Sequence, residues 1–259
     1  MSSREETTSF SEQASRQMEA LLGDLGRMYK ERNDALREVA LAHHEALMRL
    51  ARAAELRDDD TGVHIVRIGR LAETLALALG SEPAWATQLR HAAPMHDLGK
   101  LGIPDAVLKK PGSLSPEERR EMNEHPRIGA EILGRSRIGL FRLAAEVAYT
   151  HHERWDGAGY PNGLSGEDIP LSGRIVAVVD FYDALRMDRC YRPAFSEADT
   201  LDMLRGQRGK AFDPHIVDVF LAHSESIASL RDSLNDAKLD FDDLMAQAPE
   251  QLSDLFTTP

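Results

Sequence analysis

The sequence predicts an all-α protein in which one long N-terminal helix precedes a helical bundle. Apolar side chains return every three or four positions from about residue 18 to residue 54, and similar patterns recur over residues 62–223 between Gly and Pro punctuation. Only residues 174–182, with the run IVAVV, would suit a strand. Because one strand cannot form a sheet by itself and a buried helix can be apolar all round, we expect a helix there as well.

The long N-terminal helix carries a regular apolar seam. The seam consists of Met18, Leu22, Leu25, Tyr29, Leu36, Val39, Leu47 and Leu50. Arg32 and His43 interrupt it where a heptad would prefer aliphatic residues. The pattern is typical of a short two-stranded coiled coil with polar residues at two core positions, which would make the chain a homodimer. It is equally typical of a single helix packed on its own domain.

We expect three segments along the chain: a stalk over residues 1–54, a helical catalytic domain over residues 55–223, and an acidic helical tail over residues 224–259. The composition, 42% hydrophobic and 29% charged, is that of a folded globular protein. No segment predicts a signal peptide or a membrane span, so we expect a cytoplasmic protein without a membrane partner. The net charge of −12 disfavours DNA as a partner.

The candidate metal ligands are histidines and aspartates, because the single cysteine, Cys190, excludes a thiolate cage. They are Asp60, His64, His96, Asp97, His125, His151, His152 and Asp180.

The spacing of these residues favours shared sites. Asp60 and His64, four positions apart, share one face of a helix. The pairs His96-Asp97 and His151-His152 are each adjacent in helical segments, so that both members of a pair would reach one ion from neighbouring angles. Asp180 lies in the apolar run VAVVDFYDAL, where a buried carboxylate needs a cation or hydrogen bonds to neutralise it.

Five other histidines and Lys100 can also have structural roles. A lone histidine on a helix face is more often structural than a ligand, and we assign structural roles to His43, His44, His91, His215 and His223. Lys100 lies one helical turn after His96 and would add positive charge beside a bound phosphate, although a lysine at a helix end can also be simply solvated.

Five segments resemble the HD-GYP phosphodiesterases, a branch of the HD metal-phosphohydrolase superfamily. The resemblance covers about residues 50–223. The segments are RDDDTGVHIVRI (57–68), HDLGKLGIPD (96–105), HPRIGAEIL (125–133), HHERWDGAGYPNGL (151–164) and VVDFYDALRMDRCYR (178–192).

The resemblance implies an HD-type bundle in which the candidate ligands hold metal ions and Asp97 bridges them. Asp60 stands where many members have glutamate, so we expect two divalent ions, with a third as the alternative, and iron or manganese as the favoured metals. The resemblance also implies catalytic roles for Asp97 and Lys100, and substrate-phosphate contacts from Lys100, Arg189 and Arg192.

The implied activity is hydrolysis of cyclic di-GMP to pGpG, with GMP as the alternative end product. Two departures from the family pattern, Met187 and Cys190, keep other readings open. One is a receptor or signalling protein that binds a cyclic dinucleotide and turns it over slowly. Another is a phosphodiesterase for a different cyclic dinucleotide such as cyclic GMP-AMP. We also expect a signalling protein as a partner, which would act through the stalk.

Overall fold

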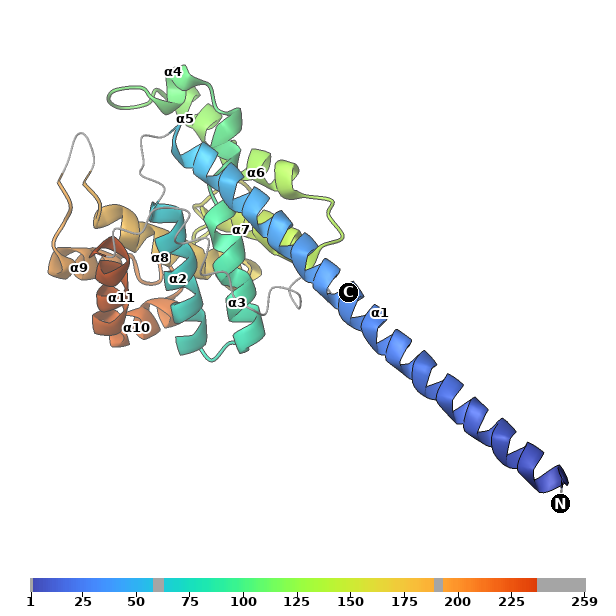
Figure 1. The fold of residues 1–259 in the computed structure, drawn as a ribbon. Helices are drawn as coiled ribbons and strands as arrows, with labels where there is room; N and C mark the ends of the chain where they lie inside the picture. Colours follow the sequence, from blue (N-terminus) through green and yellow to red (C-terminus); the bar gives the residue numbers. More distant parts are fainter. Residues whose placement is uncertain (1, 58–62, 189–192, 237–259) are drawn as a thin grey trace.

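A computed structural model describes residues 2–57, 63–188 and 193–236 of the chain, and these residues fold into helices joined by loops (Figure 1). The elements are α1 (Ser2–Glu55), α2 (Val63–Ala78), α3 (Pro83–Ala92), η1 (Ala93–Met95), η2 (Leu98–Gly102), α4 (Asp105–Leu108), α5 (Pro116–Met122), α6 (His125–Leu133), α7 (Gly139–Thr150), η3 (Gly166–Asp168), α8 (Leu171–Leu185), α9 (Glu197–Gln207), α10 (Pro214–Ala222) and α11 (Ser224–Asp236). No β-strand occurs among them, so the predicted all-α fold class is confirmed.

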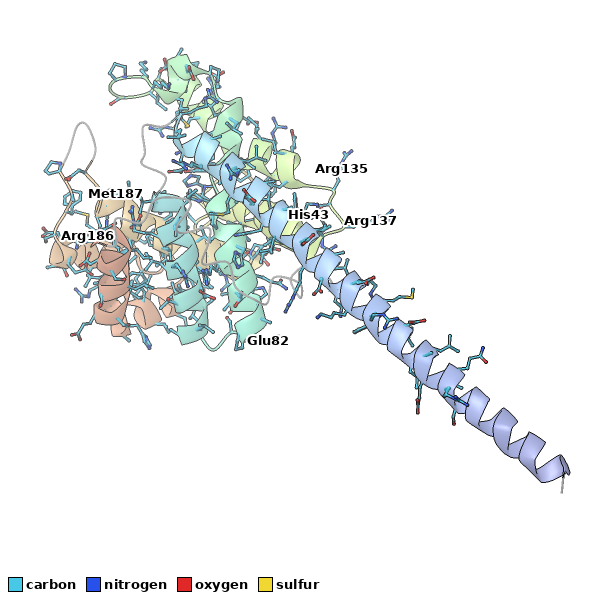
Figure 2. All side chains as sticks on the ribbon, viewed as in Figure 1. His43, Glu82, Arg135, Arg137, Arg186 and Met187 are labelled. Atoms are coloured by element: carbon cyan, nitrogen blue, oxygen red, sulfur yellow. The ribbon has the colours of Figure 1, made fainter. Side chains whose placement is uncertain are left out.

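Helix α1 is a single 54-residue helix whose C-terminal part lies along the bundle, while its N-terminal part extends away from every other element (Figure 1). His43 lies close to where α1 leaves the bundle (Figure 2). After this point Leu47, Met48, Ala51 and Ala54 are buried. The predicted seam is exposed at Met18, Leu22, Leu25, Tyr29, Leu36, Val39 and Leu50. The helix therefore has one face packed on the bundle and a second apolar seam on its surface.

Two apolar clusters form the core of the bundle. The larger cluster joins α2, α3 and α7 to α8, α9, α10 and α11. The smaller one joins α1 to residues of α2, α3, α6 and α7, and it includes Met95 and Leu98 on either side of the His96-Asp97 pair. Of the helices in the described part of the chain, none is long and apolar enough to cross a membrane.

The IVAVV segment lies in α8, as predicted. Ile175, Val176, Val178, Val179 and Tyr182 are all fully buried. Neighbouring helices cover α8 on several sides, since it packs against α2, α7, α9 and α10. A helix in this position has no need of a polar face.

Residues 89–100 (LRHAAPMHDLGK) do not form the one helical segment that was expected around His96 and Asp97. Helix α3 ends at Ala92, and two short 3-10 helices, η1 and η2, follow with His96 and Asp97 between them. Pro94 explains the break, because proline lacks the N–H that would continue the α-helical hydrogen bonding.

A candidate metal centre

Seven of the eight predicted ligands lie in the described part of the chain, and the structure brings them together in two groups. The ligand atoms of each group lie within 4.8 Å of one another. One group consists of Asp97, His125, His151 and His152, and the other of His64, His96 and Asp180. Asp60, Arg189, Arg192 and Cys190 lie outside the described residues.

Most of these side chains occupy helix ends. His64 lies in the first turn of α2, His125 is the first residue of α6, and His151 directly follows the last residue of α7. Only Asp180 comes from the middle of a helix, α8. The chain thus reaches the centre at points where it also turns, which explains how residues more than a hundred positions apart meet there.

Backbone carbonyls orient three of the imidazole rings. Nδ1 of His96 lies 3.0 Å from the carbonyl oxygen of Ala93, and Nδ1 of His125 lies 2.8 Å from that of Met122. Nδ1 of His151 lies 3.0 Å from the carbonyl oxygen of Ala148. Since a carbonyl oxygen only accepts, each Nδ1 carries the proton and donates it, which leaves a lone pair on Nε2 of the neutral ring.

The Nε2 atoms point at one another and at carboxylates. Nε2 of His125 lies 3.4 Å from Nε2 of His151. Asp97 Oδ1 lies 3.2 Å from the first of these nitrogens and 3.6 Å from the second. Nε2 of His96 is buried without a hydrogen-bond partner among the described residues. Lone pairs that face each other in a buried space repel unless a cation lies between them, so this donor set fits divalent transition-metal ions.

Asp97 faces both groups. Its Oδ1 lies beside His125 and His151, whereas its Oδ2 lies 3.3 Å from Nε2 of His96 in the other group. Oδ2 also lies 2.9 Å from Nζ of Lys100. A carboxylate placed in this way can contribute one oxygen to each of two ions.

The electrostatics of the site favour ionised Asp97 and neutral His151 and His152. Burial alone would raise the pKa of Asp97, but the charge of Lys100 and the neighbouring histidines hold it well below its usual range. Burial lowers the pKa of His151 and His152. Neutral imidazole and ionised carboxylate are the forms that bind a metal.

Asp183 forms a hydrogen bond with His64 of the second group, a contact that the sequence did not predict. This fully buried carboxylate accepts hydrogen bonds from Nδ1 of His64 at 2.7 Å, from Arg67 at 2.8 Å and from Arg231 at 2.9 Å. It therefore orients the imidazole of His64 as a second carboxylate behind a metal ligand does. Its position three residues after Asp180, on the same face of a helix, was the available signal.

Glu55 was also missed. The side chain is only 5% exposed at the last position of α1, and burial raises the pKa of its carboxyl above the usual value. It lies nine positions before His64, a spacing that predicts no shared helix face.

His44 and His91 form a buried pair away from the two groups. Their side chains are 5% and 4% exposed, and their ring centroids are 4.4 Å apart. They join α1 to α3, so the structural roles assigned to these two histidines agree with their position.

Met187, one of the two departures from the family pattern, is half-buried beyond the end of α8, next to Arg186 (Figure 2).

A helical bundle with two neighbouring His/Asp groups that could each hold a metal ion is consistent with the class of binuclear metal-binding proteins. The chain belongs to the HD domain family, whose model matches residues 5–216. The resemblance to the HD-GYP branch drawn from the sequence is thereby confirmed.

Several curated relatives are similar to about three quarters of this chain. The chain is 46% identical over 187 residues to the cyclic di-GMP phosphodiesterase response regulator RpfG of Xanthomonas campestris pv. campestris, which covers 72% of this chain and 50% of that one. It is 42% identical over 192 residues to 3'3'-cGAMP-specific phosphodiesterase 2 of Vibrio cholerae, with 74% and 37% covered. The chain thus spans about half the length of these relatives, or less.

Two solved structures share the fold. A cyclic GMP-AMP specific phosphodiesterase of V. cholerae superposes with a TM-score of 0.59 at 18% identity, over 81% of this chain and 54% of that one. An HDG"Y"P protein from Bdellovibrio bacteriovorus superposes with a TM-score of 0.50 at 20% identity, over 79% and 64%. At these identities the similarity shows the fold alone.

Proposed function

We propose that the chain is a metal-dependent phosphodiesterase that hydrolyses cyclic di-GMP to pGpG and onward to GMP. The observation that carries this proposal is the position of Asp97, whose two oxygens face the two His/Asp groups. Two divalent ions held there, iron or manganese by preference, supply a nucleophile at neutral pH and neutralise charge on the phosphate. A third ion with Asp60 as a ligand is the alternative stoichiometry.

Residues of the chain have three roles: holding the ions, stabilising charge and contacting phosphate. The seven described ligands would hold the ions, and Asp97 would be shared between the two groups. Lys100, 2.9 Å from Asp97, adds a positive charge that attracts the anionic substrate and stabilises charge on the reacting phosphate. Arg189 and Arg192, outside the described residues, would offer bidentate donors to a phosphate of the substrate.

The test is hydrolysis of cyclic di-GMP by anaerobically metal-loaded protein, followed by chromatography. We expect pGpG to form first and GMP later. Lys100→Met should lower kcat/KM by about a hundredfold or more while the metal content stays unchanged, because the charge and not the ion is lost. Tight binding of cyclic di-GMP with negligible turnover under several metals would instead support the receptor function.

Cyclic GMP-AMP is a second candidate substrate, favoured by the 42% identity to a 3'3'-cGAMP-specific enzyme. The metal site does not read the base, so the preference rests on contacts to the nucleobases. Comparison of kcat/KM for the two dinucleotides separates the candidates.

We further propose that the exposed seam of α1 pairs two copies of the chain and passes a signal from a partner protein to the bundle. The seam residues Leu22 and Leu25 are 61% and 63% exposed, so no described residue of one copy covers them. Leu25→Glu should convert a dimer into a monomer in light scattering without loss of folding, whereas Leu77→Glu, an exposed position on α2, should not. A wild-type protein that stays monomeric throughout the micromolar range would contradict the pairing.

A further inference from the structure

Helix η2 carries Lys100 and begins directly after Asp97, so its position determines where both side chains lie. Asp97 is the residue before its first turn, and the amide of Lys100 donates to the carbonyl oxygen of Asp97 at 2.9 Å. Five residues of 3-10 helix are too few to be stable by themselves. Neighbouring elements must therefore hold η2 in place.

Helices α6 and α1 both pack against η2. Gly99 lets the backbones of η2 and α6 approach closely, since a Cβ there would lie 1.8 Å from the carbonyl oxygen of His125. From α1, the buried side chains of Ala51 and Ala54 lie in the same apolar cluster as Leu98 of η2. The end of α1 is therefore one of the surfaces that determine where η2 lies.

Arg57, two residues beyond α1, binds the C-terminal end of η2. Its guanidinium donates to the carbonyl oxygens of Lys100 at 3.0 Å, Leu101 at 2.7 Å and Ile103 at 2.9 Å. The last carbonyl oxygens of a helix have few partners within the helix, and a cation at that end also suits the helix dipole. Arg57 thus acts as a C-terminal cap that another element contributes to η2.

The backbone of Arg57 is continuous with α1. Its amide donates to the carbonyl oxygen of Ala54 at 3.2 Å, and the amide of Leu56 donates to that of Arg52 at 2.9 Å. The Arg57 side chain also pairs at 2.6 Å with Asp105, whose side chain is 65% exposed. A shift of the last turn of α1 would consequently move the guanidinium and the carbonyl groups that it binds.

We propose that Arg57 is a positioning residue of the metal centre, which fixes η2 against the end of α1 and thereby places Lys100 and Asp97. Nζ of Lys100 lies 2.9 Å from Oδ2 of Asp97. A displaced η2 would therefore change both the charge beside the substrate and the oxygens that face the two His/Asp groups. The proposal rests on the proposed metal-dependent function for the role of Lys100, and it adds a route by which the position of α1 alters the centre.

The test uses Arg57→Gln, which removes the charge and the planar fork of donors, in the full chain. Its matched control is Asp105→Asn, which removes the exposed ion pair of Arg57 and leaves the contacts to the carbonyl oxygens. In the metal-free protein, the amides of Lys100 and Ile103, which close the turns of η2, should exchange hydrogen faster in Arg57→Gln than in the wild type. In Asp105→Asn their exchange should match the wild type, because an exposed ion pair contributes little.

Two functional readouts distinguish positioning from stabilisation alone. Titration with Mn²⁺ in a calorimeter should show an affinity about tenfold lower in Arg57→Gln. The kcat for cyclic di-GMP should fall at least about tenfold with a smaller change in KM, because a misplaced Lys100 affects the transition state more than binding. Arg57→Lys keeps the charge without the fork, so it should recover part of both losses. The same variant replaces Arg57→Gln if that protein does not fold.

Unchanged Mn²⁺ affinity and kcat in Arg57→Gln, measured well below its melting temperature, would overturn the proposal even if the variant is less stable. Unchanged exchange at Lys100 and Ile103 would also overturn it. Exchange and Mn²⁺ titration need no nucleotide, so they test Arg57 independently of hydrolysis. A wild type that binds Mn²⁺ without turning over cyclic di-GMP would contradict the proposed activity, while faster exchange and weaker Mn²⁺ binding in Arg57→Gln would still support the positioning role.

Discussion

At the scale of single residues, Gly99 occupies the closest approach between η2 and α6. A Cβ at this position would lie 1.8 Å from the carbonyl oxygen of His125 and 2.5 Å from the backbone nitrogen of Gly129. Gly99→Ala must therefore displace the segments that carry Asp97 and His125. We expect the free energy of unfolding to fall by roughly 1–3 kcal/mol and Mn²⁺ affinity to fall with it, measured by denaturant unfolding and calorimetry.

The control for Gly99→Ala is Gly206→Ala in α9, where a Cβ would meet no atom within 4 Å. Alanine is the better helix former, so this variant should be neutral or more stable by up to about 1 kcal/mol. Equal effects at the two positions would contradict the close approach.

Asp183 is the second residue on which the centre depends. Asp183→Asn keeps the shape but leaves Arg67 and Arg231 buried without their counter-charge. We expect a loss of about 3–5 kcal/mol in the free energy of unfolding and a roughly 10–100-fold lower metal affinity through His64. Asp202→Asn, which disrupts an exposed pair with Arg205, should cost less than about 1 kcal/mol, and a similar loss in both variants would count against the buried network.

The sequence predicted the ligand types but not the atoms that orient them. His64, His96, Asp97, His125, His151, His152 and Asp180 all lie in the two groups, although their roles as ligands stay predictions until an ion is measured. The carbonyls that hold Nδ1 of the rings come from helix ends, which local patterns do not locate to the residue. Arg231 reaches Asp183 through tertiary packing, for which no spacing along the chain is a signal.

At the scale of elements, the contact between α1 and α3 should be sensitive to pH through His44 and His91. Burial and the charge of Arg90 lower the pKa of His44 to about 4, and burial, His44, Arg90 and Arg70 lower that of His91 well below its usual value. Because the unfolded chain binds these protons first, the stabilising contribution is complete above about pH 6.5 and is lost as the pH falls towards 4.

The prediction is a free energy of unfolding that declines between about pH 6.5 and pH 4, by up to about 1.4 kcal/mol per pH unit for each histidine. His44→Gln should make this decline shallower, because one of the two titrating groups is gone. His223→Gln, at an exposed position after α10, should leave the slope unchanged. An identical slope in all three proteins would refute the role of the pair.

Element prediction succeeded where burial determines the pattern and failed where one residue breaks it. The apolar run in α8 was assigned correctly because a helix inside a bundle has no solvent face. The segment around His96 was assigned as one helix, since its apolar spacing is helical, but Pro94 divides it into α3, η1 and η2.

At the scale of the whole molecule, the bundle and the stalk are joined at the metal centre. The all-α class was predictable from periodicity alone. The angle at which α1 leaves the bundle was not, because few described positions distinguish the packed face of α1 from its exposed seam: His44, Leu47, Met48, Ala51, Ala54 and Glu55. The expected segments at residues 1–54, 55–223 and 224–259 stay predictions, and residues 237–259 of the tail lie outside the described part of the chain.

The central claim is that Asp97 joins two metal sites in one pocket, and elemental analysis of anaerobically purified protein tests it most directly. We predict two divalent ions per chain in the wild type, and the loss of at least one of them in Asp97→Ala together with all hydrolysis of cyclic di-GMP. A wild type that purifies and reconstitutes without bound metal, or an Asp97→Ala variant with an unchanged metal content, would contradict the account.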